Sequence, residues 1–307
     1  MKAVFIFAGQ GSQALGMAKD FYENCSQAKE FLQDASDHCK IDFKHLLFEP
    51  NEDLNKSEFT QPAIVLSSLM AYLAFKERLD LECKCALGHS LGEISALCVQ
   101  GGISFLDALF LVRNRALFMQ EDCDKIEAGM LVVLGLSDKQ VEQICQEALA
   151  KNKQIYAANY NCDGQIVVAG MKAHLQAYEA EFKKAGAKRT MLLNMSVASH
   201  CPLLKEASVK FKALLENSLS SSFKPVISNA SAKPYISKNE ALSLLSEQLI
   251  KPVLYKQSIK NVEVNTDFFV EFSSATLKGL NKKNTSKETY SFTNLNELDE
   301  IIKVIGR

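Results

Sequence analysis

The sequence carries almost no excess of either charge and no long apolar run. Its 307 residues contain 35 Lys and Arg against 36 Asp and Glu, which gives a formal net charge of −1. A balance of this kind argues against nucleic acid or a membrane surface as a partner. The longest uncharged stretch, Phe59 to Phe75, includes Gln61 and Pro62. It predicts a buried helix with Pro62 in its first turn, and not a membrane span.

A signal peptide and a zinc-binding pattern are missing as well. The apolar run from Met1 to Phe7 is too short for a signal-peptide core, so it predicts a buried first strand. The nine cysteines are scattered, and Cys83-x-Cys85 lacks the spacing of a zinc-binding pair. We therefore expect free thiols in a cytoplasmic protein that needs no metal.

The order of predicted elements indicates an inserted subdomain. The composition, 47% hydrophobic and 23% charged, is that of an ordinary globular protein. From residue 129 the pattern follows the order β-α-β-β-α-β, which is the split unit of a ferredoxin-like sandwich. The predicted strands span 130–136, 155–160, 165–169 and 187–193, and the helices span 138–150 and 172–185. We therefore predict a small ferredoxin-like (βαββαβ) subdomain over residues 125–194.

The flanking residues, 1–124 and 195–307, are predicted to form one discontinuous catalytic domain. In its C-terminal part, helices are expected at 202–216, 239–249 and 296–305, and strands at 225–228 and 267–272. Such alternation favours an α/β fold with a sheet that is covered by helices on both faces. Together with the serine motif below, it predicts a large α/β-hydrolase-like domain with a parallel sheet.

The most informative motif is Gly88-His89-Ser90-Leu91-Gly92-Glu93, which fits the Gly-x-Ser-x-Gly nucleophile elbow. The tight strand-to-helix turn of an elbow needs small residues two before and two after the serine. Cys83 to Leu87 precedes the motif as a run of strand length, and Leu91 to Val99 has apolar residues at helical spacing. The context predicts Ser90 as a nucleophile that is lifted toward the substrate.

A serine hydroxyl is a weak nucleophile at neutral pH and needs a nearby base. Among the five histidines, His38 and His45 lie in polar stretches, and His174 lies in the predicted insertion. His89 is adjacent to the serine, so its side chain should point away from the serine's face. By elimination, His200 is the candidate base, in the loop that follows the insertion.

Acyl transfer passes through an oxyanion that needs convergent main-chain N–H donors. The N–H of Leu91, directly after the serine, is one candidate. The turn Gly9-Gln10-Gly11-Ser12-Gln13 is the expected source of the second, because its glycines allow close approach to a ligand. This turn matches neither a phosphate-binding loop nor a dinucleotide fingerprint.

As a set, the motifs resemble those of the malonyl-CoA:acyl-carrier-protein transacylases of type II fatty acid synthesis. The further matching segments are Ser199-His200-Cys201, Arg115-x-x-Phe118-Met119-Gln120 and Gln248-Leu249-x-x-Pro252-Val253. The resemblance covers nearly the whole chain. It implies an enzyme that moves malonyl from coenzyme A to the phosphopantetheine thiol of acyl carrier protein through an acyl-serine. Coenzyme A is then a substrate, no cofactor or metal is implied, and a monomer is expected.

The resemblance also implies roles for individual residues. Ser90 would carry the malonyl group and His200 would be the general base. The N–H groups of Gln10 and Leu91 would form the oxyanion hole.

Three more roles follow from the same resemblance. Arg115 would pair with the malonyl carboxylate, although helical periodicity alone leaves Arg113 as an alternative, since both have apolar neighbours. The main-chain carbonyl of Gln248 would orient His200. Asn161, in the predicted turn between two strands, would help to line the acyl pocket.

The chain departs from the family at four places. Ala8 and Tyr255 stand where proline and tryptophan are usual. Cys162-Asp163-Gly164-Gln165 replaces Ser-Pro-Gly-Gln, and Ser273-Ser274-Ala275 replaces Gly-Pro-Gly. None of these changes touches the expected nucleophile, base or arginine.

Other functions remain open. A serine hydrolase or thioesterase of the α/β-hydrolase type would need an acid and then a histidine late in the chain, yet no histidine follows His200. A non-catalytic module that docks carrier proteins would not need Ser90, His200 and Arg115. A polyketide-type acyltransferase that uses a substituted malonyl unit would carry the same motifs.

Overall fold

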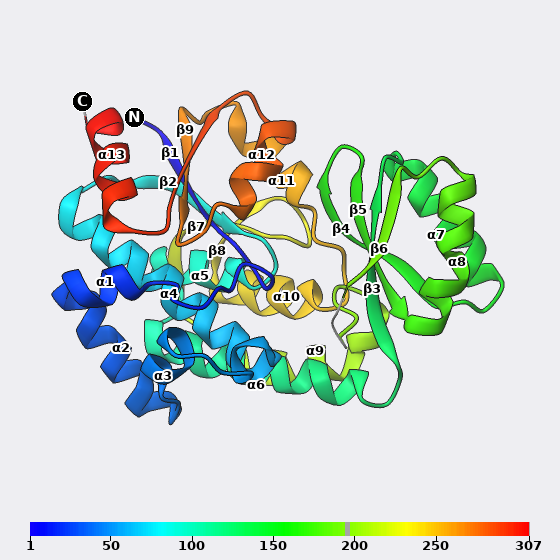
Figure 1. Cartoon of the computed structure of the whole chain (residues 1–307), viewed down its shortest axis with the longest axis horizontal. Coiled ribbons are helices and arrows are strands. Elements are labelled where there is room, and N and C mark those ends of the chain that lie inside the picture. The colour runs from blue at the N-terminus through cyan, green and yellow to red at the C-terminus, as the bar shows by residue number, and fades with distance from the viewer. Residues whose placement is uncertain (194–196, 307) are drawn as a thin grey trace.

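The computed structural model describes residues 1–193 and 197–306, and two separate sheets dominate it (Figure 1). The larger sheet has six strands in the order β10-β9-β1-β2-β7-β8. Its strands are β1 (Ala3–Phe7), β2 (Cys83–Gly88), β7 (Ser222–Ile227), β8 (Pro234–Ser237), β9 (Phe268–Phe272) and β10 (Glu288–Phe292). All neighbours pair in parallel except β7 and β8. The predicted parallel sheet is confirmed, with one antiparallel edge strand.

Helices cover both faces of the larger sheet, as predicted. In β1, Phe5 and Phe7 point into one core while Val4 and Ile6 point into another, because successive strand residues alternate in direction. The first core contains α1 (Lys19–Asn24), α2 (Ser26–Cys39), α3 (Phe43–Phe48), η1 (Asp53–Asn55), α4 (Ser57–Arg78), α5 (Gly92–Val99), α6 (Phe105–Cys123), η2 (Pro202–Leu204), α9 (Lys205–Leu215), α10 (Lys238–Gln248) and α13 (Leu295–Ile305). The second contains α11 (Tyr255–Glu263) and α12 (Thr276–Asn284). None of the helices in the described residues has the length and apolar character needed to cross a membrane.

The second sheet is antiparallel and has four strands in the order β4-β5-β3-β6. Its elements follow the predicted succession: β3 (Ala128–Leu134), α7 (Asp138–Ala150), β4 (Ile155–Cys162), β5 (Gln165–Met171), α8 (Lys172–Lys184) and β6 (Arg189–Leu192). Both helices pack on one face, around Val141, Leu175 and Phe182. In Figure 1 this unit lies to the right of the larger sheet. The predicted boundary between residues 194 and 195 falls outside the described residues.

Several element boundaries differ from the prediction. Helix α4 begins at Ser57, so Pro62 lies beyond the first turn that was predicted for it. Strand β4 continues through Cys162, which places Asn161 on a strand and not in a turn. The prediction missed β8, β10, α11 and α12. In α11 the buried side chains include Lys256 and Ser258 as well as Tyr255 and Ile259.

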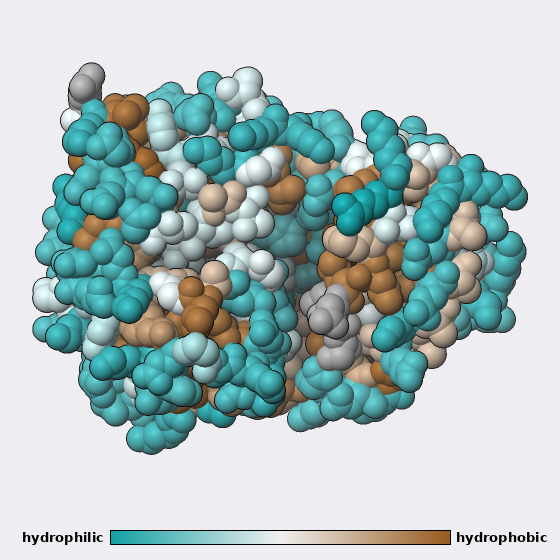
Figure 2. All heavy atoms as spheres, in the orientation of Figure 1, coloured by the Kyte–Doolittle hydropathy of each residue, from teal (hydrophilic) through white to brown (hydrophobic). Residues whose placement is uncertain are grey.

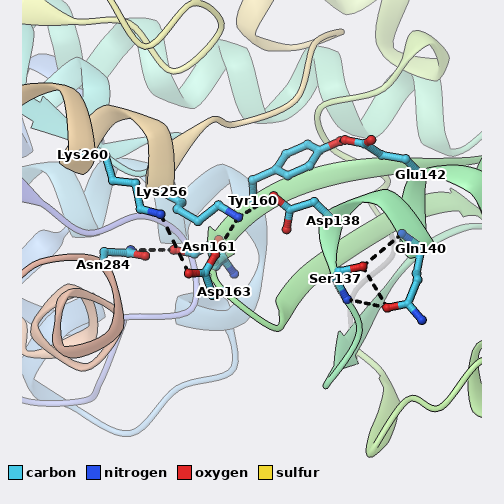
Figure 3. Close-up of polar contacts among 10 residues, drawn as sticks. All are labelled: Ser137, Asp138, Gln140, Glu142, Tyr160, Asn161, Asp163, Lys256, Lys260 and Asn284. Carbon is cyan, nitrogen blue, oxygen red and sulfur yellow. Dashed lines mark hydrogen bonds and ion pairs between the residues drawn. The ribbon is translucent and has the colours of Figure 1, made fainter.

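The two sheets are joined through β4. The Tyr160 N–H donates to the Val253 carbonyl at 2.9 Å, and the Val253 N–H returns a bond to β4 at 2.8 Å. Lys256 of α11 reaches both Asp138 and Asp163 of the second unit (Figure 3), and its ammonium lies 3.0 Å from Asp163 Oδ1. These contacts hold the second sheet against α11 and the segment that precedes it.

Candidate active site

Ser90 lies at the turn between β2 and α5, as the motif predicts. Its φ of 53° is in the left-handed region, which is strained for a residue other than glycine. A Cβ added to Gly88 would lie 1.9 Å from the Gly92 carbonyl carbon, and one added to Gly92 would lie 2.0 Å from the Phe7 oxygen. Neither glycine can be replaced without moving the main chain, which explains the motif's spacing.

Asn229, in the loop after β7, holds the same turn through two side-chain hydrogen bonds. Its Oδ1 accepts a hydrogen bond from the Ser90 N–H at 2.6 Å, and its Nδ2 donates to the Gly88 carbonyl at 2.7 Å. The Asn229 side chain is fully buried. It therefore satisfies main-chain groups of the strained turn that water cannot reach.

His200 lies within hydrogen-bond distance of the serine hydroxyl. Its Nε2 is 2.7 Å from Ser90 Oγ, and its Nδ1 is 2.7 Å from the main-chain carbonyl of Gln248. Because a carbonyl only accepts, Nδ1 carries the proton and Nε2 is left to accept one from the serine. Burial and, secondly, the charge of Arg115 lower the pKa of His200 to about 3. The ring is therefore neutral at physiological pH, as a base must be.

His89 turns away from the serine and contacts the second sheet. Its Nε2 lies 2.7 Å from Asn161 Oδ1, and its ring centroid lies 5.6 Å from that of Tyr255. The Asn161 carbonyl in turn accepts a hydrogen bond from Asn284 Nδ2 at 2.8 Å (Figure 3). Asn161 thus links the second sheet to the residue beside the nucleophile. The fold therefore brings Asn161 to the site, but its side-chain oxygen is occupied by the hydrogen bond with His89.

Arg115 is 1% exposed and also points at the serine. Its Nη2 donates to Ser90 Oγ at 3.2 Å and to Gln248 Oε1 at 3.2 Å, while Nη1 donates to Gln61 Oε1 at 2.9 Å. Burial lowers the pKa of Arg115 to about 10, against the opposing effect of the Glu93 charge. The guanidinium is therefore protonated at neutral pH, and its hydrogen-bonded partners are all uncharged. A buried cation in this state favours an anionic ligand.

The structure separates Arg115 from Arg113, which periodicity left as an alternative. Arg113 donates to the Cys39 carbonyl at 2.9 Å, and its guanidinium lies over the Phe59 ring. Both contacts are made with α2 and α4 and not with the serine. Which of the two arginines reaches Ser90 depends on the side of α6 that faces the elbow. Tertiary packing sets that side, and the helical period alone does not.

The turn at Gly9 packs directly against the elbow. A Cβ added to Gly9 would lie 2.4 Å from the His89 oxygen and 3.7 Å from the Leu91 nitrogen. The two turns meet because β1 and β2 are parallel and in register, so that both strands end at the same edge of the sheet. Throughout residues 1–193 and 197–306, neither the Gln10 N–H nor the Leu91 N–H has a hydrogen-bond acceptor.

A pocket of about 300 Å³ extends from His200 toward the second sheet. Most of its walls are apolar side chains of α7, β4 and the segment after α10, among them Cys145, Leu149, Tyr156, Ala157, Ile250 and Pro252. The space-filling view shows a furrow between the two units (Figure 2). His200 therefore borders open space at the junction of the two sheets.

Sequence reasoning missed the contribution of Gln61, Glu93 and Asn229. Gln61 and Glu93 are large polar residues buried in two mostly apolar helices, and a polar side chain in such a setting is a signal that could have marked them. Asn229 stands in an ordinary polar loop and carries no such signal. Among the residues that the structure describes, no group of three or more His, Cys, Asp or Glu is placed to hold a metal.

A strained serine, a neutral histidine that is oriented by a carbonyl, and two adjacent N–H donors together form the arrangement of a serine acyl-transfer enzyme. Comparison with known proteins agrees with this class. The chain belongs to the acyl transferase family, because the family model described as an acyl transferase domain matches residues 4–297.

The individual relatives and solved structures to which the chain is similar are malonyl transacylases. The chain is 35% identical to the malonyl CoA-acyl carrier protein transacylase of Bacillus subtilis over 286 residues, which is 92% of this chain and 90% of that protein. It superposes on the malonyl-CoA:acyl carrier protein transacylase of Helicobacter pylori with a TM-score of 0.96 and 43% identity, covering 100% of this chain and 99% of the other. A malonyl-transacylase solved in complex with its type II PKS acyl-carrier protein gives a TM-score of 0.95 and 31% identity, covering 99% and 100%.

Proposed function

We propose that this chain transfers malonyl from malonyl-CoA to acyl carrier protein through an ester on Ser90. The observation that carries the proposal is the convergence of two side chains on one hydroxyl. His200 Nε2 and Arg115 Nη2 lie 2.7 and 3.2 Å from Ser90 Oγ. A base beside a serine serves any acyl transfer, whereas a buried arginine beside both suits an acyl group that carries its own carboxylate. The names of the relatives support this substrate.

In the first half-reaction, Ser90 Oγ attacks the thioester carbonyl carbon while His200 Nε2 takes the hydroxyl proton. The carbonyl oxygen becomes an oxyanion and accepts hydrogen bonds from the Gln10 and Leu91 N–H groups. When the C–S bond breaks, His200 returns the proton to the coenzyme A sulfur. The products are malonyl-Ser90 and coenzyme A.

The second half-reaction runs the same steps with a different thiol. His200 takes the proton of the phosphopantetheine thiol, and the sulfur attacks the malonyl ester. Collapse of the second oxyanion returns the proton to Ser90 Oγ and releases malonyl-carrier protein. The Gln248 carbonyl keeps Nδ1 of His200 protonated in both halves, so no acidic third residue is needed.

We propose that residues 125–194 form a ferredoxin-like subdomain, inserted into an α/β-hydrolase-like domain made of residues 1–124 and 195–307. The strand order β4-β5-β3-β6, with two helices on one face, supports this description. Asn161 would line the acyl pocket from this subdomain, since its side chain lies beside the elbow.

The proposed reaction uses coenzyme A as a substrate and requires no cofactor or metal. We propose that the enzyme acts as a monomer in the cytoplasm and serves fatty acid synthesis. Malonyl transfer for polyketide synthesis is the second candidate, because one similar structure pairs a malonyl-transacylase with a type II PKS acyl-carrier protein.

The test is intact-mass measurement after mixing the protein with malonyl-CoA, acetyl-CoA or methylmalonyl-CoA. We expect malonyl-CoA to add one malonyl mass at Ser90, and addition of carrier protein to remove it as malonyl-carrier protein. Ser90→Ala should form no adduct and keep its fold, because alanine is no larger than serine. Release of free malonate without transfer would indicate a hydrolase, and the absence of any adduct would indicate a docking module.

A further inference from the structure

Glu93 is a buried carboxylate to which the proposed chemistry gives no task. It lies in the first turn of α5, has no exposed surface, and is three residues after the nucleophile. Burying a carboxylate is costly unless several donors hold it. The cost at this position indicates that the carboxylate contributes something that an apolar side chain would not.

Glu93 Oε2 is held by two donors of the site, and the carboxylate also interacts with the buried Tyr235 of β8. Its Oε2 accepts a hydrogen bond from the Asn229 N–H at 2.9 Å and from Gln248 Nε2 at 2.7 Å. Gln248 Nε2 also donates to the main-chain carbonyl of Ser90 at 3.0 Å. Both protons of the Gln248 amide are therefore held by acceptors.

This arrangement determines which way the Gln248 side chain faces. An amide presents two N–H groups on one side and an oxygen on the other. With its nitrogen held by Glu93 and the Ser90 carbonyl, the oxygen must face Arg115, where it accepts a hydrogen bond at 3.2 Å. If the amide were flipped, its oxygen would meet a carboxylate and a carbonyl, and its N–H groups would meet a guanidinium.

We propose that Glu93 is a positioning residue that fixes the Gln248 amide and, through it, the guanidinium of Arg115. The inference rests on the proposed malonyl transfer, in which Arg115 pairs with the substrate carboxylate. Gln248 then has two separate tasks, one for its side chain and one for its main-chain carbonyl. The side chain serves Arg115 and depends on Glu93, whereas the main-chain carbonyl serves His200 and does not.

Two variants distinguish the effect of the hydrogen bonds that the Glu93 side chain accepts from the effect of its charge. Glu93→Gln keeps the length of the side chain and, with its oxygen at the Oε2 position, still accepts from the Asn229 N–H and Gln248 Nε2, but it removes the charge. Glu93→Asp keeps the charge and is shorter by one methylene, so it cannot reach both donors. The rates of Ser90 acylation by malonyl-CoA and by acetyl-CoA are measured for each. Burial raises the pKa of Glu93 to about 7, so the assay is run above that pH, where Glu93 is charged.

We expect Glu93→Gln to keep the malonyl-over-acetyl preference within about threefold, and Glu93→Asp to lower it by about tenfold or more through a higher KM for malonyl-CoA. Acetyl acylation should change little in either variant, because acetyl makes no use of Arg115. The reverse order of the two variants would show that charge matters and would overturn the proposal. An equal loss for both substrates would show a merely structural role and would also overturn it.

The wild-type protein in the same assay separates this inference from the proposed function. Without a malonyl adduct on the wild type, the proposed function itself fails. With the adduct present, only the comparison of Glu93→Gln and Glu93→Asp decides the role of Glu93.

Discussion

At the scale of single residues, the site places a neutral imidazole and a buried guanidinium on one hydroxyl. His200 and Arg115 both lie within hydrogen-bond distance of Ser90 Oγ. The cation disfavours a second positive charge nearby, so it helps to keep His200 neutral. In the proposed reaction Arg115 would both select the substrate and lower the pKa of His200, and the two effects can be measured separately.

Arg115→Ala should change the substrate preference without abolishing catalysis. The malonyl carboxylate would be desolvated with no partner, which costs roughly 2–5 kcal/mol by comparison with truncated charge pairs. Malonyl acylation should fall accordingly, while acetyl acylation holds or rises. Arg115→Lys should rescue poorly, since lysine lacks the planar fork. Single-turnover acylation with both thioesters measures the effect, and Arg113→Ala on the same helix is the control. Equal losses for both substrates would make Arg115 a structural residue.

The pH dependence of acetyl acylation should report the effect of Arg115 on the base. His200 acts in its neutral form, and its pKa is about 3 in the free protein, so kcat/KM should stay level well below the ordinary histidine value of 6.5. Removal of the Arg115 charge raises the pKa of His200, and the acid limb of Arg115→Ala should move to higher pH. Acetyl-CoA is used because its acyl group has no carboxylate to titrate. An unchanged limb, or one that moves to lower pH, would contradict the assignment of His200 as the base.

Which residues the sequence could predict follows from how local their signals are. Ser90 was predictable because the glycines that the turn requires lie within its own motif, and His200 because few histidines compete with it. The Gln248 carbonyl and Arg115 came from the family resemblance. Asn229 and the part played by Glu93 could not be predicted, since their contacts join segments far apart in the chain.

At the scale of helices and strands, too, the sequence predicted best the elements that have local signals. Helix α7 has the predicted bounds because Ser137 and Gln140 form a capping box at its start. The order of elements in the second sheet was also predicted correctly. The missed α11 and α12 complete the second core, where polar residues such as Ser258 and Asn281 are buried with the apolar ones. Their burial depends on the whole fold and not on a local pattern.

The ion pairs of Lys256 should govern how firmly the β4–β5 turn is held. The Lys256 side chain is only 8% exposed and binds both Asp138 and Asp163. Lys256→Met keeps an apolar stem of similar length and leaves the turn without this contact. We expect faster amide hydrogen exchange across residues 160–165, with a loss of about 1 kcal/mol or less in global stability because both aspartates regain water.

Lys260→Met is the matched control for this prediction. Lys260 approaches the same Asp163 at 3.8 Å but is 48% exposed, so its removal should leave exchange of the turn nearly unchanged. High salt should accelerate exchange in the wild type toward the Lys256→Met rate, since it screens the pairs in part. Equal exchange in the two variants would show that packing alone, and not Lys256, holds the turn.

At the scale of the whole molecule, the nine cysteines report on the integrity of the fold. All are free, and all but the partly exposed Cys83 are buried. They are spread over both units: Cys145 lies in the core of the second sheet, while Cys85 and Cys98 lie in the two cores of the larger one. A thiol reagent therefore samples the opening of every core at once.

We expect the folded protein to react slowly with a thiol reagent and the denatured protein to release nine thiols without reductant. The thiolate is the reactive form, and burial raises the pKa of Cys83, Cys145 and Cys201 to about 12. For the eight buried thiols, reaction in the native state must then follow opening of the cores, so its rate should rise with denaturant in parallel with unfolding followed by circular dichroism. Fewer than nine thiols after denaturation would reveal a disulfide. Fast reaction of several thiols in the native protein would show that the cores open far more readily than their packing indicates.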